Sequence, residues 1–261
     1  MLTEHLRALL DAKVDLYERP DFIAADPISI PHRFSLKQDI EVAGILSATI
    51  AWGNRKAIVA KANVMADMLG GSPFDFVMHA TESQIDALAS FTYRTFQQED
   101  LPSMIRGLRH AYSVCPTLSL EDLFLPDHSE TLLDGIARFR CAMVPVMAER
   151  SVKHIANPAT RSAAKRVCMF LRWMVRPATR GVDFGIWARI MPSQLVIPLD
   201  VHCARTARAL GLLDRAQSDW RAATELTDNL RSLSPSDPVR YDFALFSIGI
   251  NEGGVRIQHI T

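Results

Sequence analysis

Lys165 is a candidate nucleophile. It lies in the segment NPATRSAAKRVCMFLRWMVRP (157–177), where Ser162 is expected to cap a helix and Lys165 to take its third position. Only about one lysine amine in 2,500 is neutral at pH 7, so a nucleophilic lysine needs help from its surroundings. A helix N-terminus, neighbouring arginines and partial burial all disfavour the ammonium form. The alternative is a surface lysine in a basic segment.

Asp200 is the candidate acid-base partner. It ends the apolar run LVIPLD (195–200) and precedes the helical pattern VHCARTARALGLL (201–213). One interpretation is a simple N-cap, because Asp is favoured there and contributes about 1 kcal/mol. A carboxylate held at a helix start also stays ionised, so it can accept a proton or stabilise a nearby cation.

The charge of the chain is unevenly distributed. Residues 1–149 hold 13 basic and 20 acidic residues, whereas residues 150–261 hold 16 and 9. A basic block over 151–189 contains one acid, Asp183, and eight bases: Lys153, Arg161, Lys165, Arg166, Arg172, Arg176, Arg180 and Arg189. Such a block predicts salt-sensitive contact with nucleic acid phosphates, led by Arg172 and Arg176, while the acidic half would repel a polyanion. The alternative is a solvated helix face.

Other reactive side chains give weaker signals. The four cysteines, Cys115, Cys141, Cys168 and Cys203, are too widely spaced for a metal or redox pair, which predicts reduced and mostly buried thiols. His202 beside Cys203 has no further ligand at metal-binding spacing, so no metal is expected. Aromatic residues are core by default, although one facing a cleft could stack on a base. The candidates are Trp52, Trp173, Trp187 and Phe246.

Helical spacing dominates the chain and predicts an all-α fold. In segment 38–52 a narrow close-packing stripe recurs at helical intervals, and a second helix follows over 54–69 with Asn54 as N-cap and Gly70 as the stop. Further helices are expected over 2–17, 101–113, 129–148, 162–175, 201–211, 218–232 and 238–250, the last capped by Asp237. Residues 176–200 break the pattern with three prolines and two glycines, and are expected to form a wall of the site. Neither a signal peptide nor a membrane span is indicated, so a cytoplasmic location is expected.

The run PLDVHCARTARALGL (198–212) resembles the signature VDxHVxRxxxRLG of the helix-hairpin-helix DNA glycosylase superfamily, with Asp200, His202, Arg205 and Gly211 in register. Segment 44–69 is similar to the early LLSxQT helix pair of that superfamily. The likeness is closest to the archaeal 8-oxoguanine glycosylase branch, whose Schiff-base lysine opens a helix about thirty residues before its aspartate. The whole chain also resembles a bacterial family of conserved hypothetical proteins.

The resemblance implies a two-lobed fold with a central cleft, lobe A over 35–155 and lobe B from 1–34 and 156–261. It implies Lys165 and Asp200 as catalytic residues. For substrate binding it implies Trp52, Met169, Arg172, Asp242 and Phe246, with Met169 and Phe246 on either side of a flipped base. Two motifs depart from the superfamily: NPATRSAAK (157–165) replaces the glycine-containing LPGVG hairpin, and the iron-sulfur cysteines are absent.

We therefore expect a glycosylase and lyase that excises a damaged base, such as an oxidised purine, from duplex or single-stranded DNA. No cofactor is required in this hypothesis, and no membrane partner is expected. Two alternatives remain: a nucleic-acid-binding protein without catalysis, and an unrelated helical enzyme acting on a small phosphorylated molecule.

Overall fold

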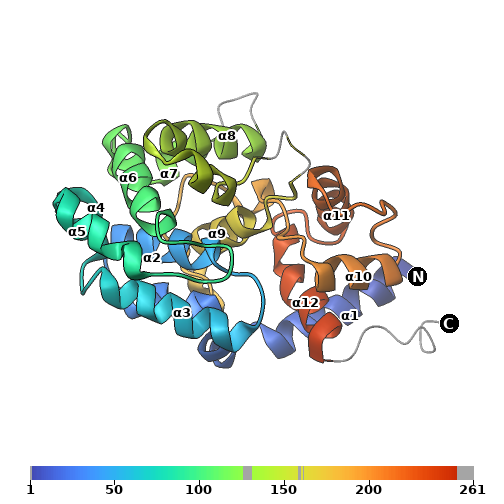
Figure 1. Cartoon of the computed structure of the whole chain (residues 1–261). Helices are drawn as coiled ribbons and strands as arrows, with labels where there is room; N and C mark the ends of the chain where they lie inside the picture. Colours follow the sequence, from blue (N-terminus) through green and yellow to red (C-terminus); the bar gives the residue numbers. More distant parts are fainter. Residues whose placement is uncertain (1, 126–130, 158–159, 161, 252–261) are drawn as a thin grey trace. The chain divides into compact units, whose positions relative to one another are not determined.

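The computed structural model describes residues 2–125, 131–157, 160 and 162–251, and it is all-α as predicted (Figure 1). These described residues contain no strand and a single isolated bridge, between Tyr93 and Phe96. The first α-helices are α1 (Leu2–Tyr17), α2 (Lys37–Thr49), α3 (Arg55–Met68), α4 (Pro73–His79), α5 (Glu82–Ala87) and α6 (Asp100–Ser113). The remaining ones are α7 (Glu121–Phe124), α8 (Leu132–Met143), α9 (Lys165–Val175), α10 (Val201–Ala209), α11 (Trp220–Leu233) and α12 (Asp242–Asn251).

Local capping signals explain several boundaries. Asn54 caps α3 as predicted, since its side chain accepts a hydrogen bond from the amide of Ala57, and Gly70 follows the helix with φ +73°. Asp237 takes the N-cap position with Pro238 directly after it, as predicted, but the helix that it begins is a 3-10 helix, η10 (Pro238–Tyr241). Its carboxylate makes no capping hydrogen bond and binds Arg176 instead.

The chain divides into two compact units, which we call unit 1 (Met1–Phe22 and Pro158–Thr261) and unit 2 (Ile23–Asn157). Unit 2 begins at residue 23, before the 35 expected for lobe A. The added segment contains the 3-10 helices η2 (Pro27–Ser29) and η3 (Pro31–Arg33), and both pack on α2.

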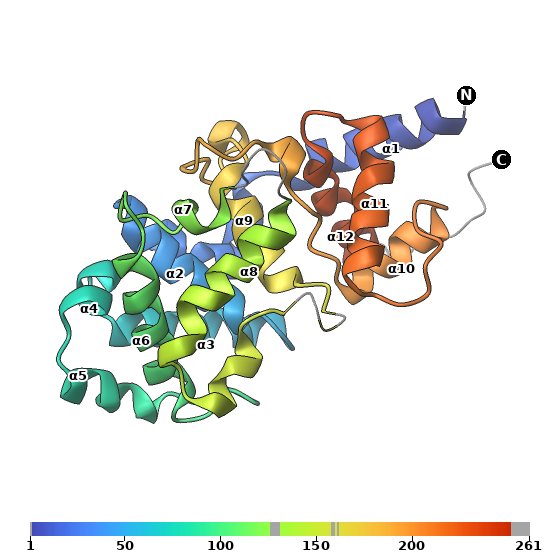
Figure 2. The same cartoon turned by 90° about the horizontal axis from the view of Figure 1, so that it is seen from above.

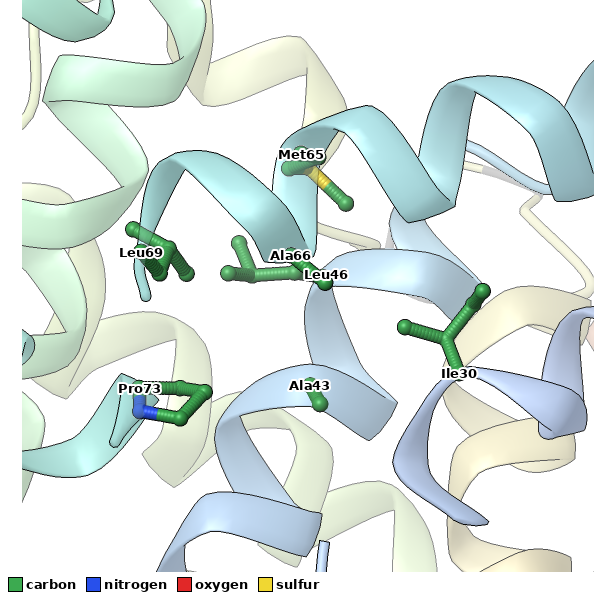
Figure 3. A pocket seen from close by; sticks show the side chains of 7 residues that line it. All are labelled: Ile30, Ala43, Leu46, Met65, Ala66, Leu69 and Pro73. Atoms are coloured by element: carbon green, nitrogen blue, oxygen red, sulfur yellow. The ribbon is translucent and has the colours of Figure 1, made fainter. Parts of the chain in front are cut away.

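Unit 2 is built around α2. Every residue from Asp39 to Thr49 is buried, so the helix is covered on all sides. The close-packing stripe predicted for this segment therefore includes too little of its buried surface. Its seam with α3 is apolar throughout and leaves no room for a water molecule (Figure 3). The lining side chains are Ile30, Ala43, Leu46, Met65, Ala66, Leu69 and Pro73. On the other side α6 packs beside α8 (Figure 2).

Unit 1 is built around α12, which packs against α1 and α10 (Figure 1). Its residues Phe243, Ala244 and Leu245 are almost fully buried, as expected for a helix at the centre of its unit. Gly249 allows α10 to approach closely, because a Cβ there would lie 3.0 Å from the Cβ of His202. Within the part of the chain that the structure describes, no helix has the length and apolarity needed to cross a bilayer.

Candidate functional site

Lys165 is the first residue of α9. Ala164 precedes it in the left-handed conformation, with φ +49°, and takes the N-cap position. The Ser162 hydroxyl accepts the amide of Ala164 at 3.1 Å. The prediction that Ser162 caps the helix and that Lys165 is third is therefore wrong. Lys165 is half-buried and lies at the positive end of the helix dipole.

Asp200 is the N-cap of α10, as predicted. Its Oδ1 accepts a hydrogen bond from the amide of Cys203 at 2.7 Å. Only one carboxylate oxygen makes this cap, so Oδ2 remains for another partner. The side chain is half-buried and held in one orientation by the start of the helix.

The charge of Asp242, at the start of α12, acts on a thiol in the first turn of α9 and on a thiol in the first turn of α10. Burial, together with the negative charge of Asp242, raises the pKa of the Cys168 thiol on α9 to about 12. Burial also raises the pKa of Cys203 on α10, with added contributions from Asp242 and Asp200. Charges perturb a thiol only when they lie close to it. The two thiols and the two carboxylates therefore share one neighbourhood in unit 1.

The orientation of α9 follows from its contact with α12. Arg172 Nη1 donates to Asp242 Oδ2 at 2.5 Å, so the face of α9 that bears Arg172 is turned toward Asp242. Lys165 and Met169 precede Arg172 by seven and three residues and lie on the same face of a helix. The structure thus places Lys165, Met169 and Asp242 along one side of α9.

Asp242 is a carboxyl group suited to proton exchange near neutral pH. Its pKa is raised to about 6, chiefly by burial. Arg172 opposes this rise, while the negative charges of Asp200 and Asp183 add to it. Groups that titrate in this range serve well as general acids or bases.

Arg172 and Arg176 are structural, and the prediction that they lead the contact with DNA phosphates is wrong. They are 4% and 3% exposed. Arg172 also lies 3.4 Å from Asp183 and stacks over the Phe243 ring, 4.3 Å from its centroid. A buried guanidinium requires carboxylate partners, and these two arginines already have them.

The partners of Arg176 come from three separate segments. Its Nη1 lies 2.6 Å from Glu18 and 2.5 Å from Asp183, and its Nε lies 3.0 Å from Asp237. We call these three carboxylates with Arg172, Arg176 and Asp242 the buried ion cluster. The cluster connects α1, α9, the irregular 176–200 segment and the start of α12, and so fixes the elements that carry the candidate site.

Comparison with known proteins identifies one family. Residues 26–251 match the family described as protein of unknown function, DUF2400. The chain belongs to the DUF2400 family. Neither a curated protein nor a solved structure matches it.

The basic block of this DUF2400 protein does not form one solvated face. Two of its eight bases are in the buried ion cluster, Lys153 belongs to unit 2, and Arg180 is paired with Asp15 and Glu18. Arg161 lies outside the described residues. Lys165 is half-buried and has no ion-pair partner among the described residues, which leaves it for a ligand-facing role.

Two of the predicted base-stacking residues are in the same unit as Lys165. Met169 on α9 and Phe246 on α12 are both half-buried, and the ring of His202 meets Phe246 edge-on with centroids 6.3 Å apart. Trp52 belongs to unit 2, where Tyr93 and His154 surround it. Trp173 and Trp187 are core residues, as the default interpretation predicted.

Little in the sequence indicates the buried ion cluster. Asp183 is the single acid among eight bases, and that isolation is a usable signal of an internal ion pair. Glu18 carries no such signal, because it lies 158 residues from Arg176. The thiols behave as predicted, with Cys115, Cys168 and Cys203 buried and Cys141 exposed. Among the described residues no group of three or more His, Cys, Asp or Glu side chains could hold a metal ion.

Proposed function

We propose that this DUF2400 protein is a DNA N-glycosylase with lyase activity, in which Lys165 is the nucleophile and Asp200 its acid-base partner. The observation that carries the proposal is that α9 opens on a lysine and α10 is capped by a carboxylate, while the charge of Asp242 acts on the first turns of both helices. Asp242 itself begins α12 and has a pKa raised to about 6.

The reaction begins with a proton transfer. Asp200 accepts a proton from the Lys165 ammonium, and the neutral amine attacks the anomeric carbon of the sugar. The bond between sugar and base breaks, and the base leaves with the bonding electron pair and takes the proton that Asp200 accepted. The Asp200 carboxylate restored in this way stabilises the positive charge that develops on the sugar.

A covalent intermediate follows. Opening of the sugar ring gives a Schiff base between its carbon and the Lys165 nitrogen. Elimination of the 3′ phosphate then cleaves the strand, and water releases the lysine by hydrolysing the imine. The side chains of Met169 and Phe246 would stack on the base once it is flipped out of the duplex.

Asp242 has a separate role in this proposal. Its Oδ2 is bound by Arg172, and Arg172 is held in turn by Asp183. The carboxyl is therefore fixed in place one turn before Phe246, where it can hydrogen-bond the edge of a flipped base. Its elevated pKa allows it to donate or accept in that bond at physiological pH.

The proposal is tested by incubating the protein with a panel of oligonucleotides that includes 8-oxoguanine, in duplex and single-stranded form. Released base and strand cleavage are measured. Asp200→Asn keeps a capping oxygen and removes the charge, so we expect a rate at least about a hundredfold lower with less than about 1 kcal/mol lost in stability.

Asp219→Asn is the matched control. Asp219 caps α11 in the same way, through the amide of Ala222 at 3.0 Å. This variant should keep full activity. Equal rates for wild type and Asp200→Asn would remove Asp200 from the mechanism. Tight DNA binding without base release on any oligonucleotide would favour the alternative of a non-catalytic nucleic-acid-binding protein.

A further inference from the structure

We infer that unit 2 carries a phosphate-binding surface for DNA, formed by Arg94 and Lys56 beside the exposed loop that leads into α3. This inference rests on the proposed function for the identity of the polyanion. The position of the surface is argued from the contacts, charges and exposure of residues in unit 2.

Arg94 is placed against this loop by a defined set of contacts. Tyr93 and Phe96 pair through their backbones, so Arg94 stands at the tip of a tight turn. The Tyr93 hydroxyl donates to the carbonyl of Trp52 at 2.9 Å. The Arg94 guanidinium then lies over Gly53, where a Cβ would be 2.8 Å from Nη1. The turn and the loop are thus fastened together.

Lys56 lies at the second position of α3, three residues after Gly53. Both Lys56 and Arg94 are exposed, as are Gly53 and Asn54 between them. The Arg94 guanidinium over Gly53 and Lys56 three residues later place two exposed cations beside this loop. Exposed cations of this kind bind the phosphates of a nucleic acid strand.

Neither cation is neutralised within unit 2. No carboxylate among the described residues forms an ion pair with Arg94 or Lys56. Their neighbours differ: Arg55 is paired with Asp26 at 3.0 Å, and Glu99, the acid nearest to Arg94 along the chain, is paired with Arg150 at 3.3 Å. The two free charges are therefore available to a ligand.

The acidic composition of this half of the chain does not oppose a polyanion at this surface. Five of its 20 acids are buried inside unit 2, where they accept hydrogen bonds from its own groups: Asp26, Asp39, Glu41, Asp100 and Glu121. A buried carboxylate with its partners in place contributes little field at a distant surface. The expectation that this half repels DNA was based on the number of its acids and not on their positions in the fold.

The backbone of Arg94 supplies a clean test. Its φ of +56° lies in the left-handed region, where glycine is the natural occupant. Arg94→Gly therefore removes the cation at a position whose backbone glycine tolerates, and the fold should be as stable or more so. If Arg94 served folding alone, Arg94→Gly would lower the stability of the protein and leave its affinity for DNA unchanged.

The experiment measures affinity for a labelled duplex containing one 8-oxoguanine across a series of salt concentrations. Each lost phosphate contact should lower the slope of log K against log salt by about 0.9. We expect this change in Arg94→Gly and in Lys56→Ala, and about twice as much in the double variant. Thermal unfolding is recorded in parallel.

Lys61→Ala is the matched control. Lys61 is exposed on the same helix, without an ion-pair partner among the described residues, but five residues after Lys56 and so about 140° around the helix. Its removal should leave the slope unchanged. Suppose that wild type binds and cleaves DNA, and that Arg94→Gly, Lys56→Ala and the double variant all keep the salt slope of wild type. This inference then fails and the proposed function stands. Absence of DNA binding by wild type would overturn both.

Discussion

Arginines and lysines of the two units differ in burial and in their carboxylate partners. In unit 1, Arg172 and Arg176 belong to the most basic part of the sequence, yet they are buried and bound to carboxylates. In unit 2, Arg94 and Lys56 belong to the acidic half, yet they are exposed and have no carboxylate partner among the described residues. The local density of charge in a sequence therefore says little about where a polyanion can bind.

The physical reason is desolvation. Moving a guanidinium out of water costs several kcal/mol, so a buried arginine requires carboxylates close by. Arg172 and Arg176 are four residues apart on α9 and meet the ring of Phe243, which draws both into the interior of unit 1. Their ion pairs fix α9 relative to Asp242 and so hold the candidate site in place.

The largest effect is expected from Arg176→Met. The substitution leaves Glu18, Asp183 and Asp237 as unpaired or weakly paired carboxylates, two of them buried, and should lower the free energy of unfolding by about 3–5 kcal/mol. Urea unfolding measures it. Arg7→Met, which breaks only a 3.7 Å exposed pair with Asp11, should cost less than about 1 kcal/mol. Similar losses in both variants would mean that Arg176 does not sustain the cluster.

The pH dependence of stability should distinguish Asp242 from an ordinary surface acid. Its pKa is raised on folding to about 6, so its contribution is most favourable below about pH 4 and is lost as pH rises through 6. Relative to Asp242→Asn, the wild type should lose on the order of 2–3 kcal/mol between pH 4 and pH 7. Urea unfolding at several pH values measures this difference. A flat difference would show that Asp242 titrates normally.

Two buried glycines compare helix packing in the units. A Cβ at Gly249 would lie 3.0 Å from Thr206 Oγ1, and one at Gly135 would lie 2.9 Å from the backbone of Phe124. Each Gly→Ala change should cost about 1–3 kcal/mol in thermal or urea unfolding. Only Gly249→Ala disturbs α10, which carries Asp200. Gly249→Ala should therefore also slow base release, whereas Gly135→Ala should not. Equal rates of base release in the two variants would show that the packing of α10 does not affect the site.

The smallest effect is expected at Ala164, a buried residue with φ +49° directly before Lys165. Glycine adopts this conformation without strain, so Ala164→Gly should raise the unfolding free energy by up to about 1 kcal/mol. Thermal unfolding measures the change. A clear loss of stability would show that the buried methyl group outweighs the backbone strain.

Local features of the molecule were predictable from the sequence. The Asp200 and Asn54 caps depend on residues three positions away, and both were predicted correctly. The short helix α5 was missed although Thr81 and Gln84 form a complete capping box, a signal present in the sequence.

Features that depend on distant residues were not predictable. The burial of Arg176 requires Glu18 and Asp237, which lie 158 and 61 residues away. The same holds for Arg172 and Asp242, 70 residues apart. Asp237 shows the conflict directly, because its sequence context indicates a helix cap while its carboxylate is taken by Arg176. The positive φ of Arg94 likewise depends on the turn between Tyr93 and Phe96 rather than on residue type.

The central claim is that Lys165 forms a covalent bond to the sugar, and borohydride trapping tests it most directly. Sodium borohydride should reduce the Schiff base and link the wild-type protein to an oligonucleotide containing 8-oxoguanine, with peptide mass mapping placing the adduct on Lys165. Lys165→Gln should abolish the adduct and keep the fold and most of the DNA affinity, since it removes only one cation. An adduct that persists in Lys165→Gln, or that maps to Lys153 or another amine, would contradict the account.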